Sequence, residues 1–371
     1  MHTRDVLVFR SNTHAHTHAD THKFSFNSTT RVVTFVHFFR ARSMGEIITF
    51  QIGGIGKKVG NLFLQNLEPK DVRSISIPSC GSDNCYAVAF HDSGPPVASR
   101  ALGEFRRLLE RCDSLQGVQF VHSLVGGTGS GVGGLLIKSV SELLNGKSIL
   151  YSACLAPTKG RNNIVLESYN SALILQDLTE FCQMVFPFTN VDQIATCLNG
   201  LTLSGRIAGS LNADLRKIHS SVVPFKNAHF LVCGSAAGKS SALALAEKAL
   251  DSSVIPLPPG GRYLATFLAY SGVSIGDVDH TTRTLQKSGT QFDPYFPDWI
   301  PNSISASISG GETPSLTCVT NNTKIHTLFD RIANAFDKQF AVRSHTYIYE
   351  QHGIHLEEMV CHVCVCVPMC V

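Results

Sequence analysis

The pattern of apolar and polar residues opens with a unit of strand, glycine turn and helix. An apolar run over 47–52 stops at the turn Gly53–Gly56, and apolar residues return at Val59 and Leu62. A short apolar run that ends in glycines predicts a buried strand and a tight turn, and the wider spacing after it predicts a helix.

Two similar units follow. One has a strand at 118–121 and a glycine-rich loop at Val125–Gly131, and the other ends an apolar run, 149–155, at Ala156–Pro157. The helix after the glycine-rich loop has one apolar face, formed by Leu136, Val140, Leu143 and Leu144. Because parallel strands place their following loops at one edge of a sheet, the repetition predicts an α/β fold. We expect a doubly wound, mostly parallel sheet whose ligand site lies at that edge.

The pattern changes after about residue 206. Strand-like segments occupy 263–270, 303–309 and 315–320, and a long helical segment follows, for which Asn321–Asn322 can provide the cap. The apolar positions of this helix are Ile325, Leu328, Phe329, Ile332, Phe336 and Phe340. These elements predict a second, smaller α+β domain with a core of its own.

Both ends of the chain break the pattern. Residues 1–43 contain the His-rich tract THAHTHADTH, and residues 360–371 read VCHVCVCVPMCV. Such residues can bind metal ions, but a low-complexity leader is typical of disorder or of a misplaced start codon, and the tail is typical of a misplaced exon. We therefore expect a leader at 1–43, domains at 44–205 and 206–359, and a Cys/Val-rich tail at 360–371.

Composition limits the kinds of partner. The 371 residues are 43% hydrophobic and 16% charged, as in a globular protein, and the formal net charge of +3 gives no basic footprint for nucleic acid. We found no apolar run of the roughly 18 residues that a membrane helix needs. The 12 cysteines are mostly scattered singly, which is typical of a reduced cytosolic protein. We expect a cytoplasmic protein that binds neither nucleic acid nor membrane.

The loop Val125–Gly131 is the strongest chemical signal. Its four glycines follow a strand and precede a helix, so that backbone N–H groups can converge on an anion at a helix N-terminus. Thr128 and Ser130 add hydroxyl donors for phosphate oxygens. The alternative is a turn in which glycine serves only the backbone dihedrals.

Two other glycine segments fit known phosphate motifs poorly. The turn Gly53–Gly56 has Val59 where a dinucleotide-binding fingerprint needs its last glycine, which disfavours that fold. Gly234–Ser240 reads GSAAGKS and has three residues between its glycines, where a P-loop has four. A P-loop enzyme that uses Lys239 is therefore the weakest hypothesis.

These residues resemble one family over most of the chain from Met44 to Met359. VGGTGSG resembles the GGGTGSG phosphate loop of tubulins, and MGEIITFQIGGIGKKVG resembles the tubulin N-terminus. Further similar segments are NLEP at 66–69, DNCYA at 83–87, VLESYNS at 165–171, DWIPN at 298–302 and HTYIYEQHG at 345–353. GSLNADLRKIHSSVVPF at 209–225 is similar to β-tubulins specifically. The resemblance implies a tubulin/FtsZ-like fold that binds GTP or GDP with Mg²⁺.

The resemblance also implies a role for individual residues. Asn84 would approach the γ-phosphate, Glu167 the ribose and Asn190 the guanine. Glu68 would lie near the magnesium. The residues implied to surround the phosphates are Gly53, Gly54, Ile55, Ser123, Gly126, Gly127, Thr128, Gly129 and Ser130.

Several positions depart from the family. Gly54 replaces a glutamine that contacts phosphate and metal, and Asn66 replaces an acidic residue, so we expect weakened magnesium binding. Val125 replaces the first glycine of the phosphate loop, where a branched side chain restricts the backbone. We expect the interval Gly200–Gly209 to be too short for the family's central helix, which carries an aromatic residue and an Asn for the guanine.

In tubulins, GTP hydrolysis is completed by a neighbouring subunit, whose acidic residue orients water. The matching position here is Lys217, which cannot act as that carboxylate, so Asn212 and Asp214 are expected to be contact residues. The first hypothesis is a nominal GTPase of the microtubule cytoskeleton that pairs with an α-tubulin-like subunit. The alternative is a pseudo-tubulin that binds no nucleotide and acts as a structural or interaction protein.

Overall fold

The structure is a computed structural model that describes residues 45–65, 72–158, 164–207, 209–251, 262–286, 303–311, 313–357 and 359. All of them belong to one compact unit, residues 43–371. The leader, the tail, Asn66, Glu68 and the segment 298–302 lie outside the described residues.

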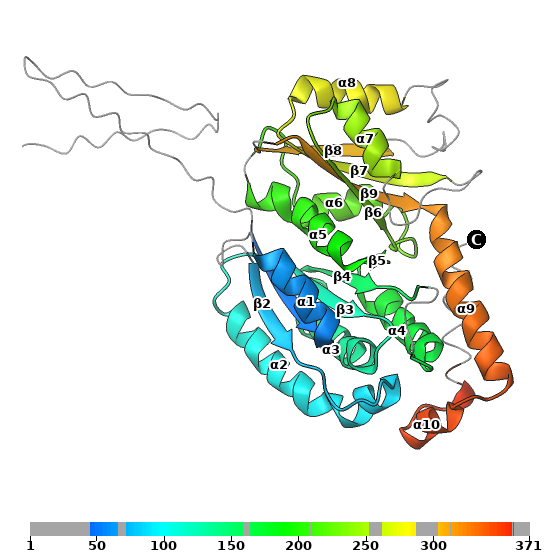
Figure 1. Cartoon of the computed structure of the whole chain (residues 1–371). Coiled ribbons are helices and arrows are strands. Elements are labelled where there is room, and N and C mark those ends of the chain that lie inside the picture. Colours follow the sequence, from blue (N-terminus) through cyan, green and yellow to red (C-terminus); the bar gives the residue numbers. More distant parts are fainter. Residues whose placement is uncertain are drawn as a thin grey trace, which may run out of the picture. The chain divides into compact units, whose positions relative to one another are not determined.

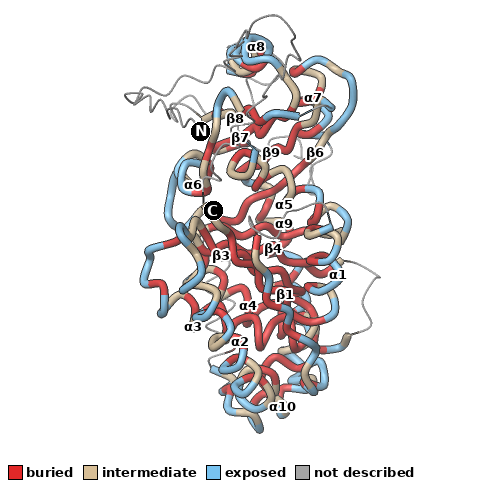
Figure 2. Tube along the Cα trace, turned by 90° about the vertical axis from the view of Figure 1, so that its left-hand side faces the viewer, coloured by how far each residue is buried: buried red, intermediate tan, exposed pale blue. Residues whose placement is uncertain are grey.

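The first sheet has five parallel strands in the order β2-β1-β3-β4-β5 (Figure 1). They are β1 Glu46–Ile52, β2 Val72–Ile77, β3 Leu115–Ser123, β4 Ile149–Leu155 and β5 Met184–Phe188. Successive side chains point to opposite faces, so Ile48 and Phe50 enter different hydrophobic clusters from Ile47. Figure 2 shows buried residues along β1, β3 and β4.

Helices cover both faces of this sheet. One face packs against α2 Gly94–Leu109, α3 Gly133–Leu144 and α4 Glu167–Phe181. The other packs against α1 Gly53–Leu64, α5 Val191–Arg206 and α6 Leu215–Val222. The predicted doubly wound parallel sheet is therefore confirmed.

The second sheet is mixed, with four strands in the order β6-β9-β7-β8. Its strands are β6 Val232–Ala237, β7 Tyr263–Ser271, β8 Ile304–Ser309 and β9 Ser315–Asn322. The helices α7 Ala242–Asp251 and α8 Ile275–Gln286 pack on one face of it in a separate hydrophobic cluster. The predicted α+β domain is therefore present. In the described part of the chain no helix is both long and apolar enough to cross a membrane.

A helix does join the two sheets, so the expectation that the chain is too short for one is wrong. Helix α5 begins at Val191, directly after β5, and its buried residues share a cluster with side chains of both sheets. That expectation counted only the interval Gly200–Gly209, whereas the apolar helical spacing already starts at Ile194 and Leu198. Helix α5 contains no aromatic residue.

The long C-terminal helix, α9, packs on the first sheet's helical layer. It runs from His326 to Ala341 after a 3₁₀ turn, and its Phe336 ring lies edge-on to Tyr169 of α4 with centroids 5.3 Å apart. A short helix, α10 Thr346–Gln351, follows it. Of the predicted cap Asn321–Asn322, Asn322 takes the N-cap position, before the 3₁₀ turn that leads into α9, but its side chain makes no cap hydrogen bond. Both residues belong to β9, and Asn321 donates instead to backbone oxygens elsewhere.

Candidate nucleotide-binding site

The loops that follow β1, β2 and β3 contact one another at the carboxyl edge of the first sheet. A Cβ added at Gly53 would lie 3.8 Å from the Thr128 side chain, and one at Gly127 would lie 2.6 Å from the backbone N and O of Cys85. An added Cβ would have no room at Gly127, whereas at Gly53 it would make an ordinary contact and the restriction is the positive φ of 70°. The structure therefore brings together three of the predicted nucleotide segments.

The glycine-rich loop leaves one approach open. Ser123, at the end of β3, accepts a hydrogen bond from the Val125 N–H at 3.2 Å, and the Ser130 N–H donates to the Gly126 carbonyl at 3.0 Å. Gly126 is partly exposed, and no atom lies within 4 Å of a Cβ built on it. The loop then enters a single π turn, η2 Thr128–Val132, and helix α3. An anion can therefore reach the start of this helix beside Gly126.

Val125 does not strain this loop. It is not among the described residues with positive φ, so valine takes a backbone conformation that any L residue can adopt. Its branched side chain therefore causes no backbone strain in this arrangement.

The two hydroxyls of the loop bond to the protein itself. Thr128 Oγ1 accepts from the Cys80 N–H and lies 3.3 Å from Ser82 Oγ. Cys80 and Ser82 both belong to the loop after β2. Ser130 Oγ donates to the Gly126 carbonyl at 2.9 Å and is fully buried. In this arrangement the hydroxyls hold the loops in place, and the backbone beside Gly126 is the part open to a ligand.

Asn84 lies at the tip of the loop after β2. It is exposed and has a φ of 55°, in the left-handed region that asparagine tolerates. Its carbonyl accepts from the side chain of Asn170 on α4 at 2.7 Å. Asn170 is a buried polar residue that the sequence reasoning missed, although it lies inside the similar segment 165–171. Its neighbours in the helix, ESYNS, are polar as well, so the apolar pattern gives no signal for this residue.

Two titratable side chains are buried below the loops. His122, one residue before Ser123, lies with its Nε2 2.8 Å from Ser152 Oγ, and burial lowers its pKa to about 4. Asp177 of α4 accepts a hydrogen bond from the Tyr86 hydroxyl at 2.8 Å, and burial raises its pKa to about 6. His122 is therefore neutral at pH 7, whereas Asp177 is mostly ionised but held in an unfavourable setting.

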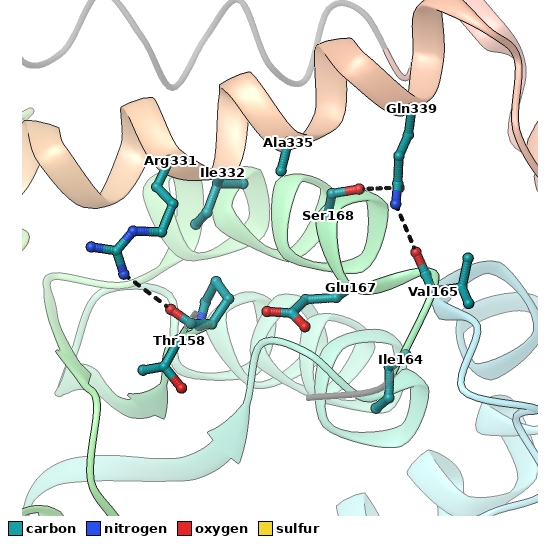
Figure 3. A pocket seen from close by; sticks show the side chains of 10 residues that line it. Thr158, Ile164, Val165, Glu167, Ser168, Arg331, Ile332, Ala335 and Gln339 are labelled. Carbon is teal, nitrogen blue, oxygen red and sulfur yellow. Dashed lines mark hydrogen bonds between the residues drawn. The ribbon is translucent and has the colours of Figure 1, made fainter. Parts of the chain in front are cut away.

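Glu167 lies on a cavity of about 290 Å³ between the loop after β4 and helix α9 (Figure 3). Gln339 of α9 contacts both α4 and this loop, accepting from Ser168 Oγ of α4 at 2.5 Å and donating to the Val165 carbonyl of the loop at 3.1 Å. Asn190 does not line this cavity. Its side chain accepts from the Asp192 N–H and caps α5. The predicted ribose and guanine residues thus follow neighbouring strands, β4 and β5, on separate loops.

Comparison with known proteins agrees with this geometry. The profile of the Tubulin/FtsZ family, GTPase domain, matches residues 65–197. The chain is 31% identical over 312 residues to the tubulin beta-1 chain of Chondrus crispus, an alignment that covers 74% of this chain and 68% of that protein. It is 30% identical over 316 residues to the tubulin beta-1 chain of Mus musculus, with coverage of 75% and 69%.

The chain belongs to the tubulin family. Within it, this is a divergent β-tubulin-like protein. A third relative, the tubulin beta chain of Candida albicans, is 28% identical over 355 residues, with 81% of this chain and 77% of that protein covered.

The predicted contact segment of this tubulin-like chain, residues 212–217, lies far from the nucleotide loops. Asp214 caps α6 by accepting from the Lys217 N–H at 2.7 Å, and the Lys217 ammonium group donates to the Asn212 carbonyl at 3.5 Å. Leu215 of the same segment lies against Gly117, near the amino ends of β3 and β4. The structure thus places 212–217 at the opposite edge of the sheet from the glycine-rich loop.

The P-loop-like segment does not form a phosphate loop. Gly234 lies inside β6 and pairs with Cys318 of β9, so only residues 238–241 connect the strand to α7. Lys239 is exposed on that short connection. Among the described residues, no three His, Cys, Asp or Glu side chains gather as a metal-binding group.

Proposed function

We propose that this tubulin-like chain is a guanine-nucleotide-binding subunit of the microtubule cytoskeleton. One observation carries the proposal: the loops after β1, β2 and β3 meet around an open approach at Gly126. Backbone N–H groups of such a loop would hold the phosphates of GTP or GDP. Glu68 would hold Mg²⁺, weakly, because Gly54 brings no side chain oxygen.

The two ends of the first sheet support a head-to-tail assembly. Nucleotide loops at one edge and the segment 212–217 at the other form two different surfaces, as a repeating polymer contact requires. The 212–217 segment of one subunit would then face the nucleotide of the next. The proposed partner is an α-tubulin-like subunit in the cytoplasmic microtubule lattice.

Hydrolysis in such an assembly depends on which subunit faces the nucleotide. Lys217 is exposed and carries a positive charge, which can stabilise phosphate but cannot accept a proton from water. A nucleotide facing this chain's Lys217 would be retained. This chain's own GTP would be cleaved only when the partner supplies an acidic residue.

Nucleotide binding by the purified full chain tests the proposal. We expect a fluorescent GTP analogue to bind saturably, to be displaced by GTP but not by ATP, and to bind only slightly more tightly with magnesium. The absence of aromatic residues from α5 favours the alternative, a pseudo-tubulin with a structural role. If a folded chain shows no saturable binding, the nucleotide-binding proposal is wrong and the alternative stands.

Restoring glutamine at Gly54 should strengthen the magnesium-dependent part of binding. Gly54 is exposed in the first turn of α1, its φ is not positive, and a Cβ built on it meets no atom within 4 Å. Gly54→Gln should therefore fit without strain, and an added polar ligand should increase GTP affinity about threefold to tenfold in magnesium.

The Gly54→Gln measurement is a GTP titration with magnesium and with a chelator. Gly54→Ala is the matched control, since it also replaces glycine with a better helix former but adds no amide. Equal affinities for the two variants in magnesium would contradict the assigned role of this position.

A further inference from the structure

One buried amide connects three parts of the chain. Asn170 of α4 is fully buried, and its Nδ2 donates to the Asn84 carbonyl at 2.7 Å and to the Val125 carbonyl at 2.8 Å. Its Oδ1 accepts from the Tyr86 N–H at 2.8 Å and from the Tyr349 hydroxyl at 2.9 Å. An asparagine amide has two donors and one oxygen with two lone pairs, so every bond of this side chain is used.

Three of these partners belong to the candidate nucleotide site. Asn84 and Tyr86 lie in the loop after β2, and Val125 opens the glycine-rich loop after β3. The fourth partner, Tyr349, lies on α10, near the far end of the described chain. A single side chain thus fixes the spacing of both loops and links them to a C-terminal helix.

Tyr349 is held firmly where it meets Asn170. Its ring is fully buried and lies edge-on to the Tyr169 ring with centroids 5.4 Å apart. His352, directly after α10, also contacts the carboxylate of Asp92, which follows the loop after β2. The hydroxyl of Tyr349 is therefore held within hydrogen-bond distance of Asn170.

We propose that Tyr349 is a positioning residue, which acts through Asn170 to hold the loops after β2 and β3 in the spacing that accepts nucleotide. The proposal extends the nucleotide-binding function proposed above and rests on it for its consequence in GTP affinity. The C-terminal helix α10 then contributes to the site without touching the ligand. A buried network in which every group is satisfied gives the loops one arrangement.

The test compares Tyr349→Phe with two matched variants of the full chain. Tyr151→Phe removes a buried hydroxyl of the same kind, which donates to Gln119 Oε1 at 2.7 Å within the first sheet and away from the loops. Tyr347→Phe changes an exposed tyrosine on α10 itself. Hydrogen exchange of residues 82–87 and 124–131 in the nucleotide-free protein is the first readout, and GTP affinity is the second.

We expect Tyr349→Phe alone to speed exchange in both loops about threefold to tenfold, the size of effect that one buried hydrogen bond supports. GTP affinity should fall by a similar factor. In an Asn170→Ala background, Tyr349→Phe should add nothing further, because the route through Asn170 is already lost.

The outcomes separate the two proposals. If the wild type binds no GTP, the nucleotide-binding function fails, while loop exchange still decides the role of Tyr349. Unchanged exchange in Tyr349→Phe, or an equal rise in Tyr151→Phe, would overturn the positioning role. Full additivity with Asn170→Ala would show that Tyr349 acts by another route.

Discussion

Gly127→Ala is expected to destabilise the folded chain by about 1–3 kcal/mol, because the added Cβ has no room. It would lie 2.6 Å from both the N and the O of Cys85 and 2.8 Å from the Asn84 carbonyl carbon. These are backbone atoms, so no side chain can rotate away. The glycine-rich loop and the loop after β2 would have to separate, and the candidate nucleotide site would lose its shape.

Gly126→Ala is the matched control for this prediction. It adds the same methyl group one residue earlier, where no protein atom lies within 4 Å. The free energy of unfolding from urea titration should fall for Gly127→Ala and stay within about 0.5 kcal/mol of the wild type for Gly126→Ala. If both variants lose GTP binding but only Gly127→Ala loses stability, then Gly126 faces the ligand. Equal stabilities would contradict the close packing of the two loops.

In the first sheet the sequence pattern predicts two inner strands, β1 and β4, well and does not predict the edge strands β2 and β5. The mostly apolar runs 47–52 and 149–155 correspond to β1 and β4, because both strands lie between two helical layers, although Thr49, Gln51 and Ser152 are buried polar exceptions. The edge strand β2 reads VRSISI, and its alternation is weak beside polar neighbours. Such a pattern does not distinguish an edge strand from a loop.

Strand β3 extends beyond its predicted bounds and contains buried polar residues. The expected strand covered 118–121, whereas the observed strand runs over Leu115–Ser123. Gln119 and His122 are fully buried in it, and each finds a polar partner on β4, Tyr151 and Ser152. Cross-strand pairs of this kind make polar residues acceptable in a buried sheet, but the partner is about 30 residues away in the chain.

The candidate site also combines features that local sequence predicts with contacts between distant residues. The glycine-rich loop and its position after a strand could be predicted, since glycine spacing is a local signal. The partners of Thr128 lie 46 and 48 residues away, and Asn170 binds residues up to 179 positions away. Local spacing carries no information about such contacts, so the support of the loops appeared only in the structure. The roles of Glu68, Asn190 and Lys217 stay predictions.

Asp177→Asn is expected to stabilise the folded chain by about 1–3 kcal/mol above pH 7. Asp177 packs on α3 where a Cβ on Gly134 would lie 2.1 Å from its Oδ2, and burial raises its pKa from 3.8 to about 6. Between these values the folded protein keeps a proton that the unfolded chain has released, so stability falls as pH rises from about 4 to 6. Asparagine cannot ionise, and its side-chain oxygen can still accept from the Tyr86 hydroxyl.

The difference in the free energy of unfolding between Asp177→Asn and the wild type should therefore increase as pH rises. Urea unfolding should show the full gain at pH 8, a decreasing gain through pH 6, and none below about pH 4. His122 has the opposite effect, since its pKa is lowered from 6.5 to about 4 and stability is lost as pH falls through that window. Both proteins contain His122, so its effect cancels in the difference. A gain that persists at pH 3.5 would mean that the asparagine packs better than the acid, and that ionisation of Asp177 is not what destabilises this part of α4.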